Sequence, residues 1–214
     1  MALDSAGKLI FDCLEVGPLA VNCYLLGQAG EGLIIDPGDE ADRILAVASR
    51  YGLDIKAIVL THGHSDHIGA VSEIRDKLKA PVCIHKEDAR MLIDPMANLS
   101  AVFGEPIIAG AADRMLNDGD SISAGNITLE VLPTAGHTRG GISLWEKNLG
   151  IVFTGDALFA DSIGRTDFPH SDHEQLISGI KKYLLSLPRQ TIVYPGHGPS
   201  TTIGQEKDNN PWLK

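Results

Sequence analysis

The segment THGHSDHIG at residues 61–69 constrains this chain more than any other stretch. It follows IKAIVL at residues 55–60, an uninterrupted apolar run of the kind that forms a buried strand. Apolar residues after the motif recur at helical spacing and predict a helix there: Ile68, Val71, Ile74 and Leu78. The segment is therefore expected to be a strand-to-helix loop. It holds four metal-binding side chains within six positions: His62, His64, Asp66 and His67.

The order of residues in the motif suggests how its side chains are shared. His62 and His64 are two residues apart on an extended segment, so their side chains point the same way and can bind one ion. Asp66 and His67 lie at the start of the predicted helix and can serve a neighbouring ion. Three further candidates follow predicted strands in glycine-flanked loops: His137 in TAGHTRGG, Asp156 in FTGDALF and His197 in YPGHGP. Strand ends meet at one edge of a packed sheet, so we expect all seven side chains to converge there.

Five histidines and two aspartates suit a borderline divalent transition metal, zinc above all, with iron or manganese as further options. The simplest partition gives His62, His64 and His137 to one ion. Asp66, His67 and His197 then bind the other, and Asp156 bridges the two. Such a centre leaves a coordination position for water, whose pKa a metal lowers to about 7. We predict two divalent ions with a metal-bridging hydroxide as nucleophile and with catalytic roles for Asp66 and Asp156.

Some polar residues receive other assignments. Asp36, in LIIDPG, is expected either to hydrogen-bond the ring N–H of a ligand histidine or to serve as a turn residue before proline. His85, His170 and His173 lack the context of the other histidines and are assigned to surface or helix-capping positions. Any single histidine is more often a surface residue than a ligand. The metal site is favoured because the whole set occurs together.

The chain alternates strand and helix patterns in two halves. Apolar runs predict strands in KLIFDCLEV, NCYLLG, GLIIDPGD, PVCIH, SISAG, ITLEVLP, GISLWE, LGIVFTGD and TIVYP. Helices are predicted before Gly52, around residues 87–92 and at about residues 172–187, and the irregular segment 94–112 is a candidate lid. This order indicates an α+β fold in which two β-sheets pack face to face with helices outside.

Bulk properties narrow the class of protein. With 43% hydrophobic and 21% charged residues, the composition is that of an ordinary globular chain, and 214 residues fit a single domain. A formal net charge of −10 argues against nucleic-acid and anionic-membrane partners and leaves a small molecule as the expected substrate. The three cysteines, Cys13, Cys23 and Cys83, show no CxxC spacing and are predicted to be buried apolar residues. The amino terminus resembles no signal peptide and no apolar run is long enough to span a membrane, so a cytoplasmic location is expected.

Taken together, the motifs resemble the metallo-β-lactamase superfamily. The resemblance covers nearly the whole chain and rests on five segments: DPG at 36–38, HGHSDH at 62–67, GHT at 136–138, TGD at 154–156 and PGHG at 195–198. It implies a four-layer αββα sandwich with a metal centre at one edge. The ligand pattern of that superfamily matches the seven positions named above.

Within the superfamily, Asp66 and His67 together with FADSIGRTDFP at 159–169 look like the small glyoxalase II-type hydrolases, which are hydroxyacylglutathione hydrolase-like. The resemblance implies cleavage of a thioester or related ester. Residues 1–214 are expected to form a single domain without the carboxy-terminal helical region of typical glyoxalase II. The chain also has HTRGG where HTPG is commoner. This places Arg139 beside His137, where it binds a substrate carboxylate or, as we favour, points into solvent.

A rival interpretation rests on GRTDF at 164–168, which also occurs in persulfide dioxygenases of the same fold. Those enzymes use a single iron, and the equivalent ligands here would be His62, His137 and Asp156. Arg165 and Asp167 are candidates for the substrate loop, although a local ion pair that shapes the loop is the preferred interpretation. A third reading, a metal-stabilised binding module, predicts coordinatively closed sites.

Overall fold

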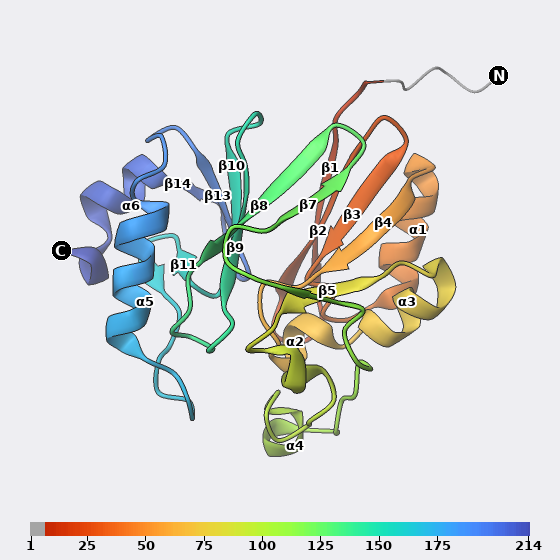
Figure 1. The fold of residues 1–214 in the computed structure, drawn as a ribbon, viewed down its shortest axis with the longest axis horizontal. Helices are drawn as coiled ribbons and strands as arrows, with labels where there is room; N and C mark the ends of the chain where they lie inside the picture. Colours follow the sequence, from red (N-terminus) through yellow and green to blue (C-terminus); the bar gives the residue numbers. More distant parts are fainter. Residues whose placement is uncertain (1–6) are drawn as a thin grey trace.

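Two mixed β-sheets lie face to face at the centre of the molecule (Figure 1) in a computed structural model that describes residues 7–214. The first sheet has the order β1-β2-β3-β4-β5-β6. Its strands are β1 (Ile10–Val16), β2 (Val21–Gln28), β3 (Glu31–Ile35), β4 (Asp54–Val59), β5 (Val82–His85) and β6 (Arg114–Leu116). The second has the order β14-β13-β10-β9-β8-β7. Its strands are β7 (Ser121–Ala124), β8 (Ile127–Pro133), β9 (Ile142–Glu146), β10 (Ile151–Gly155), β13 (Ile192–Pro195) and β14 (Thr201–Thr202). A small ribbon pairs β11 (Leu158–Phe159) with β12 (Ser162–Ile163).

Helices cover the outer face of each sheet. On the first sheet these are α1 (Ala41–Tyr51) and α3 (Val71–Leu78). On the second they are α5 (His173–Gly179), its π-helical continuation Ile180–Leu184, and α6 (Ile203–Asn209). The layers therefore run helix, sheet, sheet, helix, which confirms the predicted αββα sandwich. No helix within residues 7–214 is long and apolar enough to cross a membrane.

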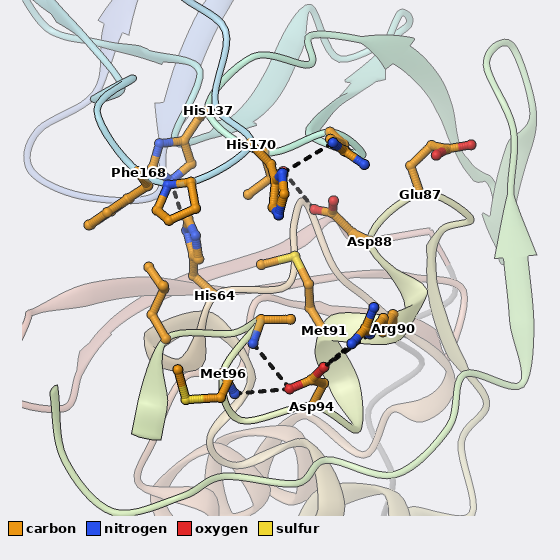
Figure 2. A pocket seen from close by; sticks show the side chains of 15 residues that line it. His64, Glu87, Asp88, Arg90, Met91, Asp94, Met96, His137, Phe168 and His170 are labelled. Atoms are coloured by element: carbon orange, nitrogen blue, oxygen red, sulfur yellow. Dashed lines mark hydrogen bonds and ion pairs between the residues drawn. The ribbon is translucent and has the colours of Figure 1, made fainter. Parts of the chain in front are cut away.

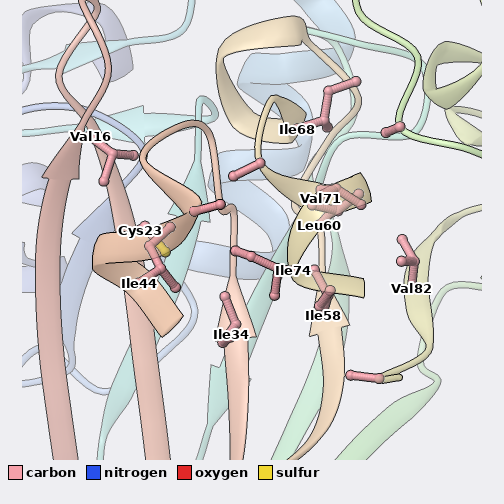
Figure 3. Packing of buried hydrophobic residues seen from close by; sticks show 14 of the residues in the cluster. Val16, Cys23, Ile34, Ile44, Ile58, Leu60, Ile68, Val71, Ile74 and Val82 are labelled. Atoms are coloured by element: carbon pink, nitrogen blue, oxygen red, sulfur yellow. The ribbon is translucent and has the colours of Figure 1, made fainter. Parts of the chain in front are cut away.

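Successive side chains of the central strands pack alternately against the helices and against the other sheet, which explains why these strands are apolar throughout. Ile34 of β3 packs among helix residues such as Ile44 and Ile74 (Figure 3), whereas its neighbours Leu33 and Ile35 belong to the cluster between the sheets. All five side chains are at most 1% exposed. A strand buried on both faces has no polar face, so the sequence shows a continuous apolar run and not a period of two.

The helix predicted after the HxHxDH segment is interrupted in the structure. It forms α2 (Ser65–Ile68) and α3, separated by Gly69 and Ala70. The amide of Ala70 donates to Pro37 O at 3.0 Å, outside the helix. A Cβ at Gly69 would lie 2.2 Å from Gly38 O. Close packing against the 36–38 loop therefore ends the first helix after one turn.

Other boundaries also differ from the sequence prediction. The helix expected at 87–92 is a 3₁₀ turn, Ala89–Leu92, and the segment 94–112 contains a short helix, α4 (Ser100–Phe103). The strands β6 and β14 and the helix α6 were not predicted, and a 3₁₀ turn, Pro211–Leu213, follows α6. Elements this short contain too few residues for a helical or strand periodicity of apolar residues to be recognised in the sequence.

Two burial predictions were wrong. Cys13 is exposed, because β1 is an edge strand: Leu14 and Val16 pack on its helix-covered face, whereas Cys13 and Glu15 on the opposite face are left uncovered. His85 is only 7% exposed at the end of β5, where its Nε2 lies 3.3 Å from Asp118 Oδ1, so it is not a surface residue. His173 matches its assignment to a helix terminus, since it is the first residue of α5.

Candidate metal centre

The seven predicted ligands meet where strands of both sheets end. Strands β3 and β4 are parallel, and their carboxyl ends lead into Asp36 and into the 61–67 loop. Strands β10 and β13 are also parallel and lead into Asp156 and His197. His137 comes from the loop between β8 and β9. Because parallel strands end at the same edge, residues far apart in sequence are gathered at one rim of the sandwich.

Ligand atoms form three overlapping triads. Within each triad the atoms lie within 4.8 Å of one another. The triads are His62, His64 and His137; His62, His67 and Asp156; and Asp66, His67 and His197. Two of them match the predicted partition, and the third places Asp156 between them. Asp156 Oδ2 lies 3.6 Å from His137 Nε2 and 3.7 Å from His197 Nε2, so this carboxylate reaches both sides.

Hydrogen bonds at the outer edge of the rings determine which nitrogen faces the centre. His137 Nδ1 donates to Arg165 O at 2.8 Å, and His197 Nδ1 donates to Leu19 O at 3.0 Å. A carbonyl can only accept, so these rings carry their proton on Nδ1 and leave an Nε2 lone pair directed inward. His67 Nδ1 lies 3.1 Å from Asp36 Oδ2. The ring of His64 is turned the other way, with Nδ1 2.9 Å from His137 Nε2.

The buried polar atoms of the site fit a cation. Three of them make no hydrogen bond with any group of residues 7–214: His62 Nε2, His67 Nε2 and Asp156 Oδ1. An unpaired buried acceptor is costly, and three that converge with the same lone-pair chemistry are unusual in a folded chain. Imidazole nitrogens and carboxylate oxygens are ligands for zinc, iron and manganese. The donor set therefore fits one divalent ion at the His62 side and a second at the Asp66 side.

Electrostatics differ between the two sides. Burial, together with the neighbouring histidines, lowers the pKa of His62, and burial is also the main reason that the pKa of His64 falls to about 3. These imidazoles are neutral and available as ligands. Burial also acts to lower the pKa of His67 and of His197, but adjacent carboxylates, above all Asp156 and Asp66, outweigh it and raise the pKa of both.

The carboxylates of the centre are held in their ionised form. Burial acts to raise the pKa of Asp66 and Asp156, but the neighbouring His67 outweighs it and the net pKa of each aspartate is lowered. The side chain of Asp66 is 21% exposed and that of His197 is 27% exposed, whereas His67 is fully buried. The Asp66 side is therefore the more open of the two to solvent.

Glycine allows the backbone to approach the ligands. A Cβ at Gly196 would lie 2.3 Å from Asp156 Oδ1 and 2.7 Å from His67 Cε1. Gly155 adopts a left-handed φ of +48°, and a Cβ there would meet Thr61 Oγ1 at 2.3 Å. Neither position has space for a side chain, so Gly155 and Gly196 are steric requirements of the site.

A carboxylate that the sequence prediction missed ties two ligand loops together. Asp88 is 1% exposed and accepts hydrogen bonds from Thr138 Oγ1 at 2.6 Å and from Gly140 N at 2.7 Å. It also accepts a third hydrogen bond, at 3.3 Å, from the amide of Gly63, which lies between the predicted ligands His62 and His64. One sequence signal could have found Asp88. It follows strand β5, which is parallel to β4, so it lies at the same sheet edge as Asp36 and the 61–67 loop.

Two hollows flank the centre. One, of about 410 Å³, is bounded by His64 and His137 at one end and by Arg90 and Asp94 at the other (Figure 2). The second, of about 260 Å³, borders Asp66 and the α4 segment. The predicted substrate-loop residues Arg165 and Asp167 pair with each other at 2.7 Å, and the Arg165 guanidinium lies 4.0 Å from the centre of the Phe168 ring. Arg139 lines the larger hollow.

Comparison with known proteins defines the class. Residues 16–197 match the sequence profile of the metallo-beta-lactamase superfamily, and the chain belongs to that superfamily. Among its relatives is the probable metallo-hydrolase YqgX of Bacillus subtilis, which is 39% identical over 201 residues, 94% of this chain and 95% of that one. Hydroxyacylglutathione hydrolase GloC of Haemophilus influenzae is 40% identical over 206 residues, 94% of this chain and 97% of that protein.

Solved structures agree on the fold. The BLEG-1 B3 metallo-beta-lactamase is 42% identical with a TM-score of 0.92, over 96% of this chain and all of that one. TTHA1623 in a di-iron-bound form is 37% identical with a TM-score of 0.85, over 94% and 100% of the two chains. ETHE1 from Myxococcus xanthus is 31% identical with a TM-score of 0.80, over 94% and 83%. The chain is thus a member of a metallo-hydrolase superfamily whose fold binds divalent metals.

Proposed function

We propose that this protein is a metal-dependent hydrolase that cleaves a small-molecule thioester or a related ester, in the manner of glyoxalase II. The observation that carries the proposal is the pair of adjacent triads, one on His62 and one on Asp66, with Asp156 between them. The likeness to hydroxyacylglutathione hydrolase GloC over nearly its whole length supports the thioester as the substrate class. Because the triads draw on both sheets, we also propose that the chain acts as one domain.

Two divalent ions, zinc first and iron or manganese as alternatives, fit the donors described above. When bound, such ions polarise a carbonyl oxygen and lower the pKa of a coordinated water to about 7. His62, His64 and His137 would hold one ion, and Asp66, His67 and His197 the other.

The chain's own residues then position the reactants. Asp66 and Asp156 are ionised and can accept the proton of the attacking water and orient its lone pair toward the carbonyl carbon. The ring of Phe168, 5.5 Å from the ring of His64, forms an apolar wall beside the first triad. A thiolate leaves without being protonated, so the mechanism needs no separate general acid.

A second candidate is a persulfide dioxygenase. It is favoured by GRTDF at 164–168 and by the 31% identity to ETHE1. This activity would use one iron on His62, His137 and Asp156 and would leave Asp66 without a role. Against it stands the complete Asp66, His67 and His197 triad.

The decisive experiment combines metal analysis with activity. Protein purified without added metal is expected to hold about two ions per chain and to cleave S-lactoylglutathione. Asp66→Ala should lose most of this activity. One iron per chain, with oxygen consumption on glutathione persulfide, would support the dioxygenase and refute the hydrolase. A parallel assay with a chromogenic β-lactam tests the activity named for BLEG-1.

We also propose a cytoplasmic location, since Cys13, Cys23 and Cys83 are free thiols, as expected in a reducing compartment.

A further inference from the structure

Arg139 projects from a rigid part of the chain. Its neighbours Thr138 and Gly140 are buried and are both bound by the Asp88 carboxylate, at 2.6 Å and 2.7 Å. A Cβ at Gly140 would lie 2.7 Å from Asp88 N, so the backbone there packs closely against Asp88. Arg139 itself is exposed. The loop is thus fixed on both sides of a single outward-facing arginine.

Within the part of the chain that the structure describes, the guanidinium of Arg139 has no carboxylate partner. Among residues 7–214, six of the eight arginines form ion pairs with aspartate or glutamate, and Arg139 and Arg114 do not. The contact that Arg139 makes is with His170, whose Nδ1 lies 3.1 Å from Nη2. An arginine can only donate, so Nδ1 accepts and the ring proton is on Nε2. His170 therefore offers a second N–H group beside the guanidinium.

The conformation of His170 is unusual. Its φ is +72°, a left-handed backbone value that residues other than glycine rarely adopt and that costs on the order of 1 kcal/mol or more. Pro169 precedes it, and the segment from Phe168 to His170 lines the same hollow as Arg139. The strained turn directs the imidazole toward Arg139.

Both residues line the 410 Å³ hollow that ends at His64 and His137. Its other charged groups are already engaged or face away. Arg90 pairs with Asp94 at 2.7 Å, Asp88 is bound by three donors, and Glu87 points away from the histidines in Figure 2. Apolar side chains form much of the remaining wall: Met91, Met96, Leu99 and Phe168.

We propose that Arg139 and His170 form a carboxylate-binding subsite that selects thioesters carrying a carboxylate some distance from the scissile bond. The forked guanidinium and the Nε2–H of His170 supply the donors, and the apolar wall accommodates the chain between that carboxylate and the thioester. The assignment rests on the proposed hydrolase function for the identity of the substrate. In a chain of net charge −10, an unpaired arginine beside the centre offsets the repulsion that an anionic substrate meets.

The test measures binding without turnover, by calorimetry with S-methylglutathione, a thioether that cannot be hydrolysed. Converting the carboxylate that occupies the subsite into an amide is expected to weaken binding by about tenfold. The glycyl and the glutamyl carboxylate are amidated separately, and the amide that binds more weakly identifies the carboxylate held by the subsite. A second pair of probes, N-acetylcysteamine thioethers ending in a carboxylate or a carboxamide, places the charge on the acyl side. A preference for the carboxylate in one series identifies the source of the anion.

Arg139→Gln should weaken binding of the preferred carboxylate probe by about tenfold and bind its amide as the wild type does. Arg139→Lys should recover part of the loss, because it keeps the charge without the fork. Arg114→Gln, the matched arginine outside the hollow, should leave both affinities unchanged. Equal binding of carboxylate and amide probes by wild type, or an equal loss with both in Arg139→Gln, would overturn the subsite. The binding test involves no turnover, so the subsite can be confirmed even if the protein does not hydrolyse thioesters. Conversely, hydrolysis of carboxylate and amide thioesters at equal rates would refute the subsite and leave the hydrolase function standing.

Discussion

The Oδ2 atom of Asp36 lies 3.1 Å from Nδ1 of His67, and this contact determines which nitrogen of a fully buried imidazole faces the metal centre. The same carboxylate accepts the amide of Thr61 at 2.8 Å and its hydroxyl at 2.6 Å. Asp36 therefore links the end of β3 to the start of the HxHxDH loop. Asp36 thus both ends strand β3 before a proline and orients His67, a candidate ligand.

Removing this carboxylate is expected to weaken the centre. In Asp36→Ala the ring of His67 loses its partner and two donors of Thr61 are left unpaired, so we expect a metal affinity about 10- to 100-fold lower. Asp36→Asn keeps one acceptor and also tolerates the positive φ of 50° at this position, so its loss should be smaller. Competition with a chromogenic chelator measures both. Equal affinity in wild type and Asp36→Ala would contradict the orienting role.

Gly196→Ala is expected to displace two ligands at once. Its new methyl group would overlap Asp156 Oδ1 and His67 Cε1, both of which belong to predicted ligands. We expect most metal and most hydrolase activity to be lost. Gly52→Ala is the control, because it meets no atom within 4 Å and tests only the cost of a left-handed φ, about 1 kcal/mol. Full metal content in Gly196→Ala would show that the backbone can adjust.

Asp88→Ala should destabilise the fold as well as the site. Three donors from two ligand loops would lose a buried acceptor, which corresponds to about 3 kcal/mol of unfolding free energy. Asp88→Asn retains a carbonyl oxygen and should lose less. Thr138→Val removes one of the three contacts and serves as an intermediate case. Urea denaturation of the four proteins gives the order, and an unaffected Asp88→Ala would show that water replaces the carboxylate.

Acidification should release the ion at the Asp66 side first. A proton competes with a metal for the Nε2 lone pair, so a histidine whose pKa is raised above its ordinary value of 6.5 loses its metal at a higher pH. His67 and His197 are of this kind, whereas the pKa of His64 is about 3 and its ring remains neutral in mild acid. Between about pH 7 and pH 5, metal content after dialysis should fall from about two ions per chain toward one. Simultaneous loss of both ions would contradict this order.

Arg165→Ala should leave the metals in place. It is the backbone carbonyl of Arg165 that accepts from His137 Nδ1, and this atom survives the substitution. The exposed side chain pairs with Asp167 and stacks on Phe168, so its loss should mainly change the Michaelis constant. Elemental analysis and steady-state kinetics separate the two effects. A substantial loss of metal in Arg165→Ala would give the side chain a role in the centre.

Much of the fold follows from local pattern. The apolar runs predicted β4, β8, β9, β10 and β13, and Gly52 ends α1 in the left-handed conformation expected of a helix stop. Glycine-flanked side chains at strand ends predicted that residues distant in sequence would converge, and the structure places His62 and His197 in triads that overlap through His67. These features depend on periodicity and on the common edge of parallel strands, and both are legible in a single sequence.

The order of elements predicted two facing sheets with helices outside, and the residue types predicted the candidate donor set, because apolar period and residue type are local properties. Local pattern did not predict that Asp88 joins the loops of residues 63 and 138–140, or that main-chain carbonyls of Leu19 and Arg165 orient His197 and His137. It also did not predict that Arg139 has no carboxylate partner among residues 7–214. Each of these depends on atoms brought together across the two sheets. The distance between such atoms is a property of packing, and no local pattern encodes it.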